Sequence, residues 1–225
     1  MMAARQRTLT AAEQRRQVAF AGKREVLQAQ GYSCREKRYK PLFVNVMAII
    51  IMLPYAILMA VFFWLLPGHA DLESFRFSNY FPSYAVFLCT FIALALALAA
   101  VHELIHGICF SRFSPDGWKS VQFGFHTAAL APYCACLVPL RKGGYIISAL
   151  MPTIVLGFLP CIAASLLGNG FVFTLGMLML FGGGGDFLMV YGMLAVRTKG
   201  KDVLFIDHPT ECGFFVFERG QAEEA

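Results

Sequence analysis

The residues best suited to chemistry form one short stretch, His102-Glu103-Leu104-Ile105-His106. In a helix, side chains four positions apart lie on one face, so His102 and His106 would stand one turn apart with Glu103 beside them. Two imidazoles at this spacing can bind one zinc ion, and a neighbouring glutamate can act as general base on a zinc-bound water. The pattern therefore predicts a catalytic metal site with His102 and His106 as ligands and Glu103 as the base.

The setting of this motif argues against a chance match. With five His and fourteen acidic residues among 225, a shuffled chain would contain His-Glu-x-x-His with a probability of about 0.7 per cent. The motif also lies in an apolar run, residues 84–110, that is long enough to cross a bilayer as a helix. Because a charge at the centre of a membrane costs roughly 2.5–3.5 kcal/mol, polar residues there need a functional reason.

The composition is that of an integral membrane protein. Hydrophobic residues make up 58% of the chain, charged residues only 15%, and the mean hydropathy is +0.60. Four apolar stretches are long enough to span a bilayer, at about residues 42–66, 84–110, 145–167 and 171–196. Pro54, Pro152 and Pro160 predict bends in the first and third, and the glycines at 182–185 interrupt the fourth.

Two further segments have the pattern of strands. In residues 118–140, Val121, Phe123 and Phe125 alternate with polar or small residues, which is typical of a β-hairpin. Residues 203–206 and 214–217 flank a turn and are also extended in character. We therefore expect an all-α membrane protein with four transmembrane helices, a small β-hairpin between the second and third helices, and short C-terminal strands.

Basic residues indicate the orientation in the membrane. Residues 1–42 carry ten Lys or Arg against three Glu, and the 111–142 loop and residues 197–201 are also basic, whereas the 67–82 loop contains one Arg. The positive-inside rule then places the chain in the cell membrane with both termini in the cytoplasm. A basic block before a span favours contact with anionic lipid, so we expect the bilayer as a partner and no nucleic acid.

The chain divides into a basic cytoplasmic arm at 1–41, a membrane-embedded domain at 42–217 and a tail at 218–225. In the arm, Thr10-Ala-Ala-Glu13 is a capping box that predicts a helix to about Gln30, ended by Gly31. This helix could lie at the membrane interface or be a solvated tail.

Asp186 is the third expected metal ligand. Of fourteen acidic residues only Glu103 and Asp186 lie within apolar spans, where no Lys or Arg can pair with them. A metal cation is the partner that would stabilise a carboxylate there. At 1.5 Å rise per residue, the depths of His102 and Asp186 in their spans agree within roughly 5 Å. The glycines before Asp186 fit a fourth helix that approaches the second closely or unwinds beside the metal.

The remaining polar residues are not counted among the expected metal ligands. His69 is expected in an exposed loop, His208 at a turn, and His126 either as an exposed hairpin residue or as a support for substrate or metal. Asn45 is expected to hydrogen-bond between helices. Cys134-Ala-Cys136 is too tightly spaced for a zinc loop and favours packing, and the seven cysteines form no disulfide framework.

Several of these motifs together resemble a known group. They are His102 to Gly107, Tyr133 to Leu140, Gly185-Asp186 and Asp207 to Thr210, which resemble the putative zincin peptidases of bacteria, small membrane metallopeptidases. More distantly, the chain is similar to site-2 proteases. The resemblance covers roughly residues 40–217 and implies zinc held by His102, His106 and Asp186, with Glu103 activating water. The Asn-Pro-Asp-Gly setting of the site-2 aspartate is replaced by glycines before Asp186.

We therefore expect a zinc-dependent integral-membrane endopeptidase that hydrolyses peptide bonds of membrane proteins or peptides within or near the bilayer. The alternative is an inactive protease relative or a metal-binding membrane scaffold. A closed structural site would need a fourth protein ligand, and a transporter would need polar residues at several depths. Glu103 beside His102 favours the enzyme. No substrate-binding residue is predicted.

Overall fold

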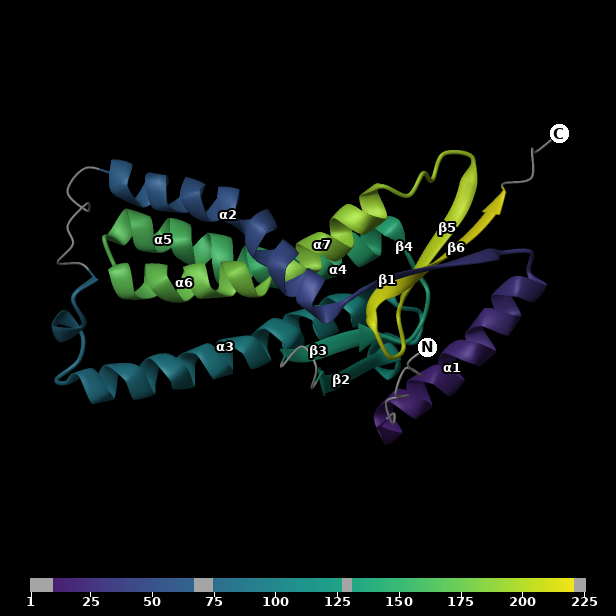
Figure 1. Cartoon of the computed structure of the whole chain (residues 1–225), viewed down its shortest axis with the longest axis horizontal. Helices are drawn as coiled ribbons and strands as arrows, with labels where there is room; N and C mark the ends of the chain where they lie inside the picture. Colours follow the sequence, from purple (N-terminus) through teal and green to yellow (C-terminus); the bar gives the residue numbers. More distant parts are fainter. Residues whose placement is uncertain (1–9, 67–74, 127–130, 221–225) are drawn as a thin grey trace, which may run out of the picture.

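The computed structural model describes residues 10–66, 75–126 and 131–220. A bundle of apolar helices forms one end of an elongated molecule, and strands and the N-terminal helix form the other (Figure 1). The helices are α1 (Ala11–Ala29), α2 (Pro41–Leu65), α3 (Tyr84–Phe113), α4 (Lys142–Thr153), α5 (Leu159–Leu167), α6 (Gly170–Gly182) and α7 (Gly184–Leu194). The strands are β1 (Ser33–Tyr39), β2 (Val121–His126), β3 (Ala131–Cys136), β4 (Leu140–Arg141), β5 (Lys201–Asp207) and β6 (Cys212–Gly220).

Within the described residues, three to four helical stretches are long and apolar enough to cross a membrane. Three are continuous, namely α2, α3 and the run Lys142–Leu167, in which a π-helical segment joins α4 to α5. The fourth is the pair α6 and α7, which meet at 41° and count as one span if they form a single broken helix. The apolar stretches expected from the sequence thus all form helices, and the last is interrupted where the glycines predicted a break.

The helix boundaries follow from local chemistry. The Ser83 hydroxyl accepts a hydrogen bond from the Val86 N–H at 3.3 Å and so caps the start of α3. Asn169 caps α6 in the same way, through the Val172 N–H at 3.0 Å. Gly168 ends α5 in the left-handed conformation, with φ of +65°. The tight turn between the third and fourth spans therefore reverses the chain within a few residues.

The glycines at the break allow α7 to pack closely against two neighbouring helices. A Cβ on Gly184 would lie 2.7 Å from the backbone oxygen of Ala48 in α2, and one on Gly183 would lie 1.7 Å from Oγ1 of Thr153 in α4. The sequence analysis expected these glycines either to approach the histidine-bearing helix closely or to unwind beside the metal. The close contacts are instead with α2 and α4, whereas the helix is interrupted at Gly183, three residues before Asp186. At its break, the fourth span packs against α2 and α4, and Asp186 in the first turn of α7 reaches the two histidines of α3.

Replacing Gly184 with Ala should therefore destabilise the protein. The added methyl group meets backbone atoms of Ala48, which cannot rotate away, so we expect a loss of about 1–3 kcal/mol in the free energy of unfolding. Gly182 is the matched control, because a Cβ there has no described atom within 4 Å. Thermal unfolding of the purified variants in detergent measures both effects. Equal midpoints for Gly184→Ala and Gly182→Ala would contradict the close contact.

The strands correct the expectation of an all-α protein. As predicted, β2 and β3 form an antiparallel hairpin, and β5 and β6 are paired. However, β5 and β6 are the centre of a four-stranded antiparallel sheet in the order β1-β6-β5-β4. The sequence analysis missed β1 because Ser33–Tyr39 is dominated by charged residues. It becomes a strand because it pairs along its whole length with β6, a tertiary contact that overrides local propensity.

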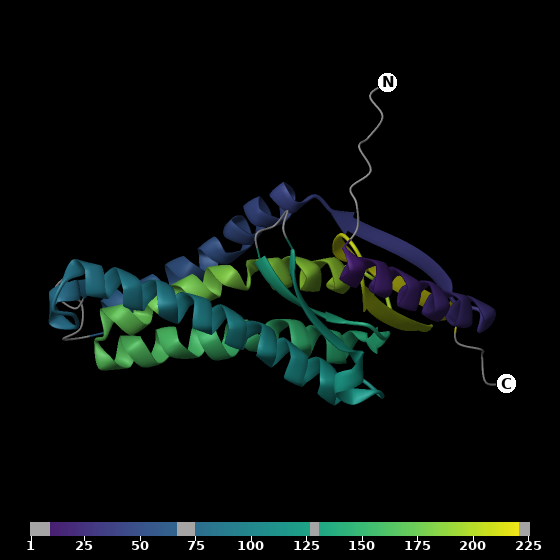
Figure 2. The same ribbon diagram turned by 90° about the horizontal axis from the view of Figure 1, so that it is seen from below.

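Helix α1 covers one face of this sheet (Figure 2). Thr10 and Glu13 form the predicted capping box, in which the Glu13 carboxylate accepts from the Thr10 N–H at 2.8 Å. Phe20 and Leu27 pack with Ile206, Phe215 and Phe217 of β5 and β6 in a small core. The helix is therefore not a free tail, because Phe20 and Leu27 are buried against the protein's own sheet. Val18 and Val26 of the same helix are exposed.

Candidate metal centre

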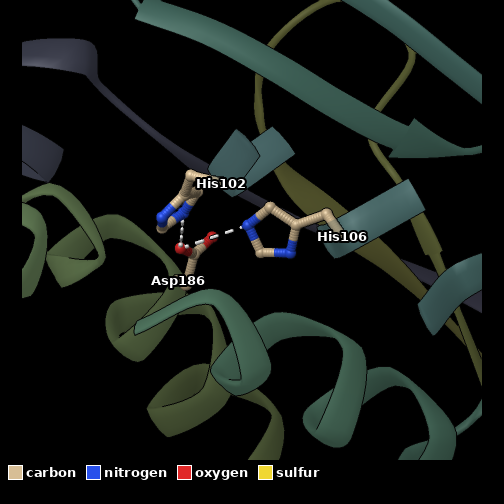
Figure 3. A group of neighbouring side chains, drawn as sticks. All are labelled: His102, His106 and Asp186. Carbon is tan, nitrogen blue, oxygen red and sulfur yellow. Dashed lines mark hydrogen bonds and ion pairs between the residues drawn. The ribbon is translucent and has the colours of Figure 1, made fainter. Parts of the chain in front are cut away.

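Three side chains from two spans converge at one point (Figure 3). His102 and His106 come from successive turns of α3, and Asp186 comes from the first turn of α7. Their potential ligand atoms all lie within 4.8 Å of one another. Both histidines are buried, and Asp186 exposes about a quarter of its side chain. Among the described residues, this is the group of His, Cys and acidic side chains that could hold a metal ion.

The distances in this group fit a small tetrahedral cation. Nε2 of His102 lies 3.2 Å from Oδ2 of Asp186, and Nε2 of His106 lies 3.4 Å from the same oxygen. Ligand bonds of 2.0–2.1 Å to tetrahedral zinc place neighbouring donor atoms about 3.3 Å apart. Two imidazole nitrogens and one carboxylate oxygen are also a common donor set for zinc. Both imidazole nitrogens therefore lie at about the spacing of zinc ligands from the same carboxylate oxygen.

The orientation of His106 is fixed by a partner behind it. Its Nδ1–H donates to the backbone carbonyl of Ser148 in α4 at 2.8 Å. The proton on Nδ1 leaves a lone pair on Nε2, which points toward Asp186, as a metal ligand requires. The ring also stacks on Phe110, one helical turn later, with centroids 6.1 Å apart. Helix α4 thus contributes to the site through its backbone, which no sequence motif could have indicated.

Asp186 is presented by the break in the fourth span. It stands in the first turn of α7, where backbone N–H groups have no partner within the helix and the helix dipole favours a negative charge. A continuous helix from Gly170 to Leu194 would have no such terminus at this depth. The glycines therefore both permit the close packing of α7 and create the helix start that suits a carboxylate.

Glu103 and the three clustered residues line one cavity of about 440 Å³. Glu103 lies beside the backbone amide of Cys134 in β3, so the hairpin forms a wall of the cavity next to this carboxylate. In Figure 2 the hairpin lies across α3, between the bundle and α1. Helix α2 supplies another wall with Ala48 and Asn45. The cavity is large enough for a short stretch of extended peptide.

A second buried carboxyl group, Asp207, stands on the wall of the same cavity. Its Oδ2 accepts from the Cys136 N–H at 2.7 Å, and its Oδ1 accepts from the hydroxyl of Tyr145 in α4. Burial raises the pKa of the Asp207 carboxyl to about 7, although the hydrogen bond from Cys136 opposes this. Asp207 therefore ties β5, the hairpin and α4 together around the cavity. From the sequence, Asp207 was noted only as part of the Asp207-to-Thr210 motif.

The other sequence candidates do not join the cluster. His208 fixes a turn, as expected, because its Nδ1 accepts from the backbone N–H groups of Thr210 and Glu211 at 3.2 and 2.8 Å. Asn45 was expected to bond between helices, but it makes no hydrogen bond within the described part of the chain. The side chain of His126 and all of His69 fall outside the described residues.

Of the two cysteines in Cys134-Ala135-Cys136, Cys136 is a packing residue, as the spacing predicted. Cys136 is buried, and its Sγ donates to the Val138 carbonyl at 3.4 Å. Burial raises the pKa of the Cys136 thiol to about 12, so it stays protonated and is a poor metal ligand. Cys134 lines the cavity, and burial also raises the pKa of its thiol well above the ordinary value.

Comparison with known proteins bears on this cluster directly. Residues 95–200 match a family described as putative zincin peptidase. No curated protein and no solved structure matches the chain significantly. The matched segment begins seven residues before His102 and ends after α7, so it includes every residue of the cluster. Residues 95–200 of this chain are therefore similar to the putative zincin peptidases, the family that its motifs resemble.

Proposed function

We propose that the chain is a zinc-dependent endopeptidase of the membrane, which hydrolyses peptide bonds within or near the bilayer. One observation carries the proposal. His102, His106 and Asp186 place three donor atoms within 4.8 Å of one another, and Glu103 lines the same cavity. Three protein ligands leave the fourth zinc position open, which is typical of catalytic and not of structural sites. The family match supports a metallopeptidase at this coarse level.

Each residue has a distinct role in the proposed reaction. Zinc would be held by Nε2 of both histidines and by the Asp186 carboxylate. When bound, zinc supplies Lewis-acid chemistry, which polarises the scissile carbonyl and acidifies water at the site. The Glu103 carboxylate accepts a proton from the attacking water and then gives it to the leaving amine nitrogen. The O–H bond of water and the C–N bond of the peptide break, and one acid and one amine are released.

The surface of the helices supports a position in the bilayer. Large apolar side chains on α2 and α3 are exposed, among them Leu42, Ile49, Leu65 and Leu96. Such a surface needs lipid or protein to cover it. The strands, α1 and the basic segments gather at one end of the bundle (Figure 1). With that end in the cytoplasm, all four spans obey the positive-inside rule, and both termini are cytoplasmic.

This orientation predicts where single cysteines can be labelled. Ser78, in the loop between α2 and α3, should react with a membrane-impermeant thiol reagent from outside the cell after Ser78→Cys. Lys199, between α7 and β5, should react only after permeabilisation as Lys199→Cys. The seven native cysteines are first replaced in the parent chain. Protection of residue 78 or external labelling of residue 199 would contradict the four-span arrangement.

The function itself is tested by the appearance of new peptide ends. The purified zinc-loaded protein is incubated in detergent with a pool of peptides, and the termini are identified by mass spectrometry. Cells carrying wild type or Glu103→Gln are compared for membrane peptides in the same way. We expect cleavages that require Glu103 and that stop when zinc is chelated. If neither assay finds such cleavages, the chain is better described as an inactive metal-binding membrane scaffold.

A further inference from the structure

The cavity is lined by one arginine side chain that has no role in the proposed reaction. Arg16 of α1 lines it and exposes only 7% of its surface. Its guanidinium lies over the ring of Tyr133 in β3, with Cζ 4.6 Å from the ring centroid. Phe20, one turn later on the same face of α1, packs against the ring of Phe215 with centroids 4.3 Å apart and holds the helix on the sheet. Arg16 is therefore fixed at the wall of the cavity.

No carboxylate of the described residues forms an ion pair with this guanidinium. Within the described residues, Arg16 forms no hydrogen bond and no ion pair, and its Nε is buried without a partner. Arginine stays charged in proteins, so a buried guanidinium without a partner is costly. Asp207, a carboxyl group on the wall of the same cavity, already accepts hydrogen bonds from Cys136 and Tyr145. Arg16 is also the only Lys or Arg among the described residues that line the cavity.

We infer that Arg16 is a substrate-binding residue that pairs with a carboxylate group of the peptide held in the cavity. The inference rests on the proposed peptidase function and adds a specificity to it. The carboxylate is either the C-terminus of the peptide or the side chain of an Asp or Glu residue. A planar guanidinium that packs its face on an aromatic ring keeps its edge for two parallel hydrogen bonds, which match a carboxylate.

The position of Arg16 suits this role. The same cavity contains Glu103 and the metal cluster, so one peptide of a few residues can contact both ends. Arg16 lies outside residues 95–200, the segment that matches the family. The specificity would therefore be contributed by the N-terminal arm of this chain, and the cleavage chemistry by the matched segment.

The inference can be tested by binding alone, without any cleavage. The full-length Glu103→Gln protein, loaded with zinc in detergent, is titrated against fluorescein-labelled mixed-sequence peptides of about ten residues. Matched peptide pools carry either a free C-terminal acid or an amide, combined with either Glu or Gln at one fixed position. Dissociation constants are measured by fluorescence anisotropy. The same titrations are made with Arg16→Gln, and with Arg15→Gln as the control, because Arg15 is exposed one position earlier on α1.

We expect the Glu103→Gln protein, which keeps its native Arg16, to prefer one kind of carboxylate-bearing pool. It should bind that pool roughly 10–100-fold more tightly than the pool with neither carboxylate. Arg16→Gln should abolish this preference, and Arg15→Gln should retain it. The pool that carries the preference, free acid or Glu, identifies the source of the carboxylate. The inference is overturned if the protein with native Arg16 shows no preference for a carboxylate-bearing pool. It is also overturned if the preference is equally large after Arg16→Gln.

Arg16→Lys keeps the positive charge at this position and serves as a second test in case Arg16→Gln does not fold. Arg16→Lys should lower the preference severalfold, because an ammonium group cannot form the paired hydrogen bonds, and an unchanged preference would overturn the inferred geometry. Zinc content and thermal midpoint report the integrity of each variant. Since binding is measured in the Glu103→Gln background, an absence of cleavage in wild type would overturn the peptidase function alone. Cleavage by wild type without an Arg16-dependent preference would overturn only the role of Arg16.

Discussion

Glu103→Gln should abolish peptide cleavage while the protein keeps its fold and its zinc. The amide has nearly the same shape as the carboxylate but cannot accept a proton from water. General acid–base catalysis typically contributes 10²–10⁴-fold, so we expect the cleavage rate to fall by about that factor or more. Glu103 is not one of the three clustered donor residues, so zinc binding should persist. Initial cleavage rates and zinc per protein, measured on the same preparation, check both halves of the prediction.

The matched control for this variant is Glu25→Gln. Glu25 is exposed on α1 and is not among the residues that line the cavity, so the same chemical change there should leave the rate unaltered. Cleavage by purified Glu103→Gln at the wild-type rate would remove this residue from the mechanism. Loss of zinc from Glu103→Gln would instead assign the carboxylate to the metal site and weaken its role as a base.

The helices and the cluster were predictable because their signals are local or follow from the cost of charge in an apolar span. His102 and His106 share a face because of helical periodicity alone. Asp186 was found by elimination, as a span carboxylate with no basic partner. The structure brings these three residues together and breaks the fourth span at the glycines, as the sequence indicated. Whether they bind zinc remains a prediction for experiment.

The missed features depend on contacts between distant parts of the chain. Strand β1 exists through its pairing with β6, about 180 residues away in the sequence, and its charged residues concealed it. The close contacts of the glycines with α2 and α4 depend on how the helices are packed, which composition does not encode. Arg16 and Asp207 reach the cavity because α1 and β5 fold back over the metal end of α3. Arg16 belongs to no motif, and the Asp207-to-Thr210 motif does not indicate that Asp207 lies at this cavity.

Asp186→Ala should remove most of the zinc affinity. The two histidines would be left as the only protein donors of the cluster, and two ligands are fewer than catalytic zinc sites use. Even loss of an outer partner of a metal ligand typically costs 10–100-fold in affinity, so we expect loss of a direct ligand to cost about 100-fold or more. Zinc per protein by elemental analysis, and a competition titration with a chromophoric chelator, measure the effect. His102→Ala should behave in the same way.

The matched control is Asp116→Ala, which changes an exposed aspartate beyond the end of α3, outside the cluster and the residues that line the cavity. It should keep full zinc occupancy at wild-type affinity. Full occupancy in Asp186→Ala as well would show that zinc is held without this carboxylate. The broken fourth span would then need another explanation, because the start of α7 brings Asp186 to 3.2 and 3.4 Å from the two histidines and no other described acid joins them. A loss of zinc confined to Asp186→Ala and His102→Ala would instead tie the glycine break directly to metal binding.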